Sequence, residues 1–312
     1  MDIEQHSLFI KSGIDELHLR LIKPVTALYA EPILMLHGSM SNGRVFYSDS
    51  GKGLACFLAQ AGFCVYVLDS AGRGLSKPAL ADGHNPSQTD VIKFHLPLVQ
   101  QFIQHRHPQQ KMHWCGHSWG GVMLLSAILR QPAITTDIAS IVTFATKRRI
   151  YTRSLKKWFM VDVVWNKVAP RLAKKHNYFA AKHYKLGMDN ESLACLLQSI
   201  DWVSGDWVDS EDGFDYLRQS ERVNWPIARF YAAQNDPVLG HQNDVKRTML
   251  ECGLADAEFI LLAKQHGYKH DYDHAGILTH ADAATDHFIE LLSWYQAHSS
   301  LLTSETVVTL HD

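Results

Sequence analysis

The sequence predicts an α/β fold, in which a mostly parallel central sheet carries helices on both faces. Short continuous apolar runs, typical of strands buried on both faces, occur at 33–36, 64–68, 112–115, 138–144, 227–232 and 258–262. Between them lie segments with apolar residues at helical spacing, at 53–61, 89–106, 120–130, 244–252 and 283–298. This alternation predicts parallel strands joined by helices, with functional side chains at the carboxyl ends of the strands.

Two regions depart from this alternation. At the start, 7–11 and 16–22 are predicted to form two short strands around a Ser12-Gly13 turn. From 147 to 223 no buried strand is expected, and 154–168, 171–183 and 191–200 are candidate helices. So long an insertion between core strands favours a helical cap. The predicted organisation is therefore core 1–146, cap 147–223, core 224–298 and tail 299–312.

Composition narrows the functional classes. Of 312 residues, 46% are apolar and 20% charged, with a net charge of −2, which is typical of a globular protein and does not favour a nucleic-acid partner. Five scattered cysteines without a Cys-x-x-Cys spacing argue against a disulfide framework or a thiolate zinc site. No signal peptide or membrane-spanning run is visible, so we expect a cytoplasmic protein without membrane association. The oligomeric state stays open.

The motif Gly116-His117-Ser118-Trp119-Gly120 lies where an apolar strand meets a helix. In this context Gly-x-Ser-x-Gly is typical of a tight turn that exposes a nucleophilic serine and points helix amides at the reacting carbonyl. Glycines are needed because side chains there would collide with the neighbouring strand and helix. The alternative is a glycine-rich turn in an ordinary βα unit. We favour Ser118 as a nucleophile.

Three motifs together resemble successive signatures of the α/β-hydrolase superfamily: 37–39 (HGS), 69–76 (DSAGRGLS) and 116–121 (GHSWGG). The similarity covers about 8–295 and is of the serine esterase and lipase type, with some likeness to the acid-lipase and polyhydroxyalkanoate-synthase-like branches. Those synthases carry cysteine at the turn and haloalkane dehalogenases carry aspartate, whereas this chain has Ser118. The resemblance implies an α/β-hydrolase fold and a catalytic triad in the order serine, acid, histidine.

For the acid, the resemblance favours Asp236, which follows the first strand after the cap; an ordinary Asp-Pro turn is the alternative. For the base it favours His274, in the loop before the last helix, with His270 as the alternative catalytic histidine. The spacing of His266, His270 and His274 would also suit zinc on a helix, but Gly267 favours a loop. We therefore predict neither a metal nor a cofactor.

The resemblance also implies an oxyanion hole formed by two backbone amides. One is that of Trp119, directly after the nucleophile, and the other that of Ser39, with Met40 as its alternative. His37 and Arg73 are expected to hold loops together. No phosphate-binding glycine motif is present in the sequence.

The predicted cap is rich in aromatic residues, which would either line an apolar pocket or pack the cap on the core. Basic residues gather where it begins, at 147–149, 153 and 156–157, and would form either an anion-attracting patch or a solvated helix face.

These features predict a serine hydrolase that cleaves small carboxylic esters with an apolar acyl or alcohol part, through an acyl-enzyme. A lactonase, thioesterase, amidase or acyltransferase would use the same triad. A binding protein that has kept the fold without catalysis is the third possibility.

Overall fold

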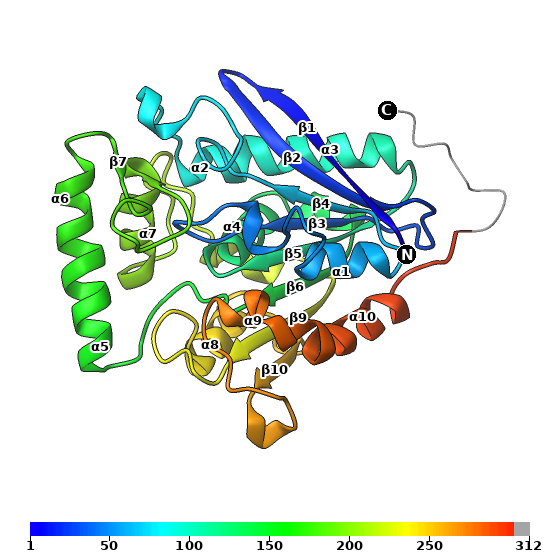
Figure 1. The fold of residues 1–312 in the computed structure, drawn as a ribbon. Helices are drawn as coiled ribbons and strands as arrows, with labels where there is room; N and C mark the ends of the chain where they lie inside the picture. Colours follow the sequence, from blue (N-terminus) through cyan, green and yellow to red (C-terminus); the bar gives the residue numbers. More distant parts are fainter. Residues whose placement is uncertain (303–312) are drawn as a thin grey trace.

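The computed structural model describes residues 1–302 and is built around one eight-stranded sheet (Figure 1). The strands are β1 (Ile3–Ser12), β2 (Asp15–Pro24), β3 (Ile33–Leu36), β4 (Val65–Leu68), β5 (Met112–His117), β6 (Ile138–Phe144), β9 (Ile227–Ala233) and β10 (Glu258–Leu262). Their order is β1-β2-β4-β3-β5-β6-β9-β10. The pairs β1–β2 and β2–β4 are antiparallel and the others parallel. This is the predicted α/β fold.

Helices cover both faces because the strands send alternate apolar side chains to opposite sides. On β3, Ile33 and Met35 join the core beneath α1 (Leu54–Gln60) and α10 (His287–Ala297), whereas Leu34 and Leu36 face the other core. That second core is covered by α3 (Leu96–Arg106), α4 (Trp119–Arg130) and α8 (Gln242–Glu251). The inner strands β3, β4, β5 and β6 are almost entirely buried on both faces, which explains their largely apolar sequences.

Shorter helical segments connect these elements. They are α2 (Gln88–Asp90), a π-helical turn at Val91–His95, α9 (Gly276–Thr279), and 3₁₀ turns at Gly43–Val45, Leu80–Asp82, Pro132–Asp137, Leu217–Arg222, Lys264–His266 and Ala281–Thr285. The predicted helix over 89–106 is therefore three consecutive segments, and the predicted helix over 283–298 begins as a separate 3₁₀ turn.

The segment between β6 and β9, called the insertion below, forms its own layer (Figure 1). A continuous helix runs from α5 (Leu155–Lys157) through a π-helical stretch (Trp158–Val168) into α6 (Ala169–Ala173), and in Figure 1 it lies outermost. Between it and the sheet lie α7 (Leu193–Ser204) and a small hairpin of β7 (Tyr178–Phe179) and β8 (Glu191–Ser192).

The predicted helix over 171–183 is wrong beyond Ala173. The chain leaves the helix in a turn at Asn177, whose φ is 62°, and then pairs β7 with β8. Phe179 is buried in this hairpin against α6 and α7, so tertiary packing takes precedence over the local helical pattern.

The predicted tail, 299–312, lies outside the described residues from 303 onward. Its first residues run beside 28–30, where Ser300 accepts a hydrogen bond from Ala30 N–H and Leu302 N–H donates to Leu28. Within residues 1–302, no helix combines the length and apolar character needed to span a bilayer.

Candidate active site

Ser118 lies in the tight turn between β5 and α4, at the carboxyl end of the central parallel strands. Its φ of 51° and ψ of −122° are strained for a side chain other than glycine. The turn depends on close backbone packing. A Cβ on Gly116 would lie 2.5 Å from Gly121 Cα, and one on Gly120 would lie 2.3 Å from the His37 carbonyl oxygen. A side chain at Gly116 or Gly120 would therefore clash with neighbouring backbone, so both positions require glycine.

Asp236 and His274 approach Ser118 from two loops that follow β9 and β10. The Ser118 hydroxyl lies 2.9 Å from His274 Nε2, and His274 Nδ1 lies 2.5 Å from Asp236 Oδ2. Asp236 is 4% exposed, and its Oδ1 accepts the Leu239 N–H at 2.9 Å. Burial on its own raises the pKa of Asp236, but the hydrogen bond and charge of His274 lower it overall. The carboxylate is thus held ionised behind the imidazole.

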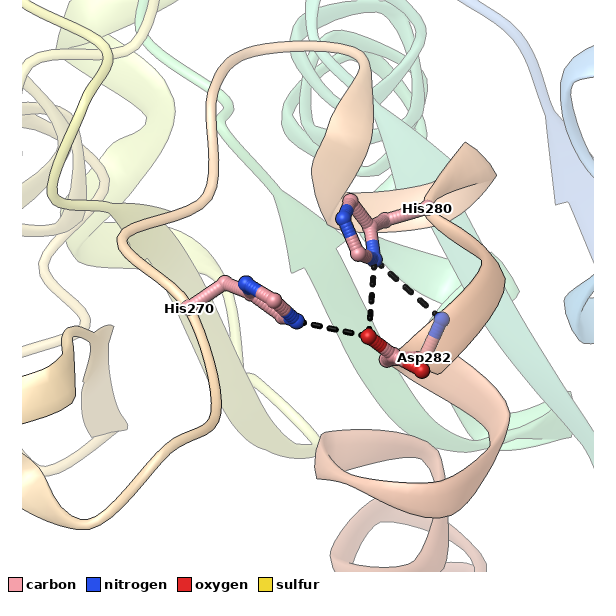
Figure 2. A group of neighbouring side chains, drawn as sticks. All are labelled: His270, His280 and Asp282. Carbon is pink, nitrogen blue, oxygen red and sulfur yellow. Dashed lines mark hydrogen bonds and ion pairs between the residues drawn. The ribbon is translucent and has the colours of Figure 1, made fainter.

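His270, the alternative base, has a different partner. Its Nε2 lies 2.7 Å from Asp282 Oδ2, and its ring is tilted by 42° against that of His280, with centroids 4.2 Å apart (Figure 2). Of the two predicted candidates, the structure thus brings His274 to Ser118. The zinc spacing of 266, 270 and 274 is not realised, because His274 faces Ser118 while His266 bonds the Leu261 carbonyl oxygen.

His270, His280 and Asp282 are a group whose donor types would suit a divalent transition metal (Figure 2). However, His280 Nδ1 already accepts the Asp282 N–H at 3.1 Å, so binding through that atom would break this bond. All three side chains are more than a third exposed, and their hydrogen bonds account for the cluster without a metal.

Two backbone amides beside Ser118 are available to a ligand. Among the hydrogen bonds of residues 1–302, neither Ser39 N–H nor Trp119 N–H has an acceptor. Gly38 packs against the nucleophile so closely that a Cβ there would lie 2.9 Å from Ser118 Cβ. The alternative donor, Met40 N–H, is already bound to Glu191 Oε2 at 2.8 Å. Of the two predicted donors in this loop, Ser39 is therefore the one left open.

The loop that carries Ser39 is held by a buried ion pair between the core and the insertion. Arg73 and Glu191 pair directly, and both are almost fully buried. Arg73 also donates to the Gly38 carbonyl oxygen at 3.2 Å, while Glu191 holds Met40 N–H. Sequence reasoning assigned Arg73 to loop support but missed Glu191, which lies 118 residues away and in no motif.

Asp189 adds a second contact between the insertion and this loop. Its backbone N–H donates to the Met40 carbonyl oxygen at 3.0 Å, and its carboxylate accepts from Asn42 at 2.9 Å and from Gly74 N–H at 2.8 Å. The insertion thus binds both the N–H and the carbonyl oxygen of Met40, through Glu191 and Asp189.

Two buried histidines support the site without reaching the serine hydroxyl. His117 Nε2 donates to the His274 carbonyl oxygen at 3.0 Å. His37 Nδ1 donates to the Gly38 carbonyl oxygen at 2.9 Å, and its Nε2 accepts the Ser70 N–H at 3.1 Å. Burial lowers the pKa of His117 to about 3 and that of His37 to about 4. Both rings are therefore neutral at pH 7.

A cavity of about 220 Å³ opens beside Asp236 and His274. The insertion helix also lines this cavity, through Lys156 and Met160. The cavity next to Asp236 and His274 is thus lined by residues of both the core and the insertion.

Known relatives agree with this architecture. The family model described as serine aminopeptidase, S33, matches residues 31–201, more than half of the chain. Gastric triacylglycerol lipase of Rattus norvegicus is 25% identical over 222 residues, which is 67% of this chain and 52% of the lipase. A tear acid lipase-like protein of Mesocricetus auratus is 31% identical over 102 residues, 30% of this chain and 26% of that protein. The chain therefore spans between a quarter and a half of these curated relatives.

Solved structures show the same fold at low sequence identity. A soluble variant of monoglyceride lipase from Saccharomyces cerevisiae superposes with a TM-score of 0.67 at 14% identity, covering 95% of this chain and 96% of that one. Carboxylesterase CesB of Bacillus subtilis gives 0.55 at 15% identity, covering 95% and 91%. With the family match and the sheet order, these likenesses assign the chain. It belongs to the serine aminopeptidase S33 family of α/β-hydrolases.

Proposed function

We propose that the protein is a serine hydrolase that cleaves carboxylic esters through an acyl-enzyme. The observation that carries this proposal is the unbroken hydrogen-bond chain from Asp236 through His274 to the Ser118 hydroxyl, with spacings of 2.5 and 2.9 Å. A serine hydroxyl is a weak nucleophile near neutral pH, and this arrangement supplies the base that it needs. Ester hydrolysis in general agrees with the lipase and esterase relatives.

In the proposed reaction, Ser118 Oγ attacks the ester carbonyl carbon while His274 Nε2 takes the hydroxyl proton. The carbonyl oxygen becomes an oxyanion that Ser39 N–H and Trp119 N–H stabilise, because both amides lack a protein acceptor within residues 1–302. His274 then gives its proton to the departing alcohol, which leaves the acyl group on Ser118. Water, deprotonated by His274, hydrolyses this intermediate and restores the serine. Asp236 holds the imidazole in the tautomer that both steps require.

Residues 147–223 are proposed to act as the cap of this site. In support, the insertion supplies Lys156 and Met160 to the cavity wall and holds the loop of Ser39 through Glu191. A substrate with an apolar acyl or alcohol part would contact Met160 on one side and Leu239 on the other.

The test compares Ser118→Ala with two histidine variants. A fluorophosphonate probe should label the wild type at Ser118, and Ser118→Ala should lose labelling and about 10³-fold or more in ester turnover. His274→Gln should lose turnover to a similar extent. His270→Gln is the matched control, since His270 bonds Asp282 rather than Ser118, and it should keep wild-type turnover.

Absence of a wild-type adduct at Ser118 would favour a non-catalytic binding protein instead. Loss of turnover in His270→Gln with retention in His274→Gln would reverse the assignment of the base. Matched ester, thioester, lactone and amide substrates then separate the esterase from the other reactions that use this triad.

A further inference from the structure

The basic residues at the start of the insertion do not form a single solvated face. Lys147 and Arg148 are buried, with 6% and 2% of their surface exposed, whereas Arg153 and Lys156 are exposed. The two buried cations come shortly after β6, which ends at Phe144, and precede α5. They therefore require a different explanation from the exposed ones.

The charge and the hydrogen-bond donors of the Arg148 guanidinium are paired within the protein. Its guanidinium binds both carboxylate oxygens of Glu251, at 2.7 and 2.8 Å, and donates to the carbonyl oxygens of Trp202 and Gly205. Lys147 differs, because within residues 1–302 its ammonium has neither a hydrogen-bond acceptor nor an ion-pair partner. Most of the Lys147 side chain is buried, but its Nζ is not among the fully buried side-chain atoms that lack a partner, so the ammonium keeps an opening through which a ligand could supply an acceptor.

Lys147 follows a residue that contacts the backbone of the nucleophile. The preceding residue, Thr146, donates its hydroxyl to the Ser118 carbonyl oxygen at 3.0 Å. The Lys147 Nζ lies 5.5 Å from the centroid of the Trp119 ring, which itself packs against Trp202 of α7. The ammonium thus lies beside the indole ring of Trp119, the residue whose backbone amide is proposed to bind the oxyanion.

Two carboxylates lie close enough to Lys147 to raise its pKa, but both accept hydrogen bonds from other groups. Asp236 bonds His274 and Leu239 N–H, and Asp244 accepts from Tyr151 N–H and from the hydroxyl of Thr152. Neither lies within ion-pair distance of Lys147. Burial lowers the pKa of Lys147 to about 8, partly offset by these two carboxylates, so the side chain is mostly charged at pH 7.

We propose that Lys147 is a specificity residue that binds a carboxylate group carried by the ester substrate. This inference rests on the proposed ester hydrolysis and defines its substrate class as esters with a free carboxylate. Such a carboxylate would supply the acceptor that the ammonium lacks, in a site where a charge-assisted hydrogen bond is strong. The carboxylate belongs either to the acyl part or to the alcohol part, and the experiment separates the two.

The test compares charged and neutral substrates on each side of the ester bond. On the acyl side, the mono-4-nitrophenyl ester of glutaric acid is compared with 4-nitrophenyl valerate. On the alcohol side, the butyryl ester of glycolic acid is compared with ethyl butyrate. In Lys147→Met, the ratio of kcat/KM for the charged substrate to that for the neutral one should fall roughly 10- to 100-fold on one side. Lys147→Arg should keep most of the preference.

The control is Lys111→Met, at an exposed lysine before β5, which should leave both ratios unchanged. If Lys147→Met changes neither ratio, the proposal is wrong. If it lowers kcat/KM equally for all four substrates, the proposal is also wrong, and Lys147 acts on the catalytic groups rather than on a substrate carboxylate.

Binding is measured separately from turnover. Free glutarate should raise the melting temperature of the wild type and of Ser118→Ala, but not that of Lys147→Met, and absence of a shift in the wild type would count against the proposal. If no ester is hydrolysed and no probe labels Ser118, the proposed function fails, while the glutarate shift still decides the role of Lys147.

Discussion

Acidification from pH 7.5 to pH 5.5 should destabilise the protein through its buried histidines. Four of them are at most 5% exposed, and burial lowers their pKa values from 6.5 to about 4 for His37 and His287 and to about 3 for His113 and His117. The folded state keeps these rings neutral across this interval, whereas the unfolded chain takes up protons at 6.5. The unfolded state thus binds more protons, and the free energy of unfolding falls as the pH falls.

The size of the effect follows from these values. A histidine with a pKa of 6.5 unfolded and 3 to 4 folded loses about 1.4 kcal/mol of stabilisation between pH 7.5 and 5.5. Four such histidines together remove about 5 to 6 kcal/mol, a large part of the usual 5 to 15 kcal/mol for a folded domain. Buried carboxyls whose pKa values are lowered, such as Asp69 and Asp236, contribute their loss at more acidic pH, because their ordinary pKa is 3.8.

Urea unfolding followed by tryptophan fluorescence at pH 7.5, 6.5 and 5.5 measures this loss. His113→Gln should shrink this loss by about a fifth, since burial also lowers the pKa of His107 to about 4 and that ring titrates over the same interval as these four. The exposed His176→Gln is the control for replacing a histidine as such. A free energy of unfolding that changes by less than about 1 kcal/mol between pH 7.5 and 5.5 would refute the reasoning.

Two further predictions concern the site. Asp236→Asn should lower kcat by about 10⁴-fold, because an amide at this position donates to Nδ1 of His274 and favours the wrong tautomer; steady-state kinetics measures this, and a loss below tenfold would contradict it. Glu191→Gln should lower kcat by about 10- to 100-fold with KM nearly unchanged, because it weakens the hold on Met40 N–H and Arg73. The exposed Glu221→Gln is its control, and an unchanged kcat in a less stable Glu191→Gln protein would reduce Glu191 to a purely structural role.

The inner strands of the sheet were predictable because they are short and buried on both faces. The run at 258–262 coincides with β10, and those at 33–36 and 138–144 coincide with β3 and β6. β3 has no polar face and β6 is buried along nearly its whole length, so their patterns depend little on the rest of the chain, whereas β10, at the edge of the sheet, begins at the exposed Glu258. The turn that carries Ser118 was also predictable from the sequence, because it requires a glycine two residues before the serine and another two residues after it.

Other features depend on contacts between distant residues and leave no local pattern. Glu191 reaches Arg73 only because the β7–β8 hairpin brings it beside the loop of Met40. Lys147 belongs to a basic stretch that looks uniformly solvated, yet the end of β6 directs it inward. In both cases the decisive information is tertiary.

The bonds from 189–191 to the loop of Met40 also bear on how readily this scaffold can be re-engineered. Exchanging the whole insertion for that of a relative would remove the partners of Met40, Asn42 and Gly74 in one step. A chimaera designed for a new substrate must therefore graft around this short stretch and keep it in register with the loop. Insertion and core are, in this sense, not interchangeable modules.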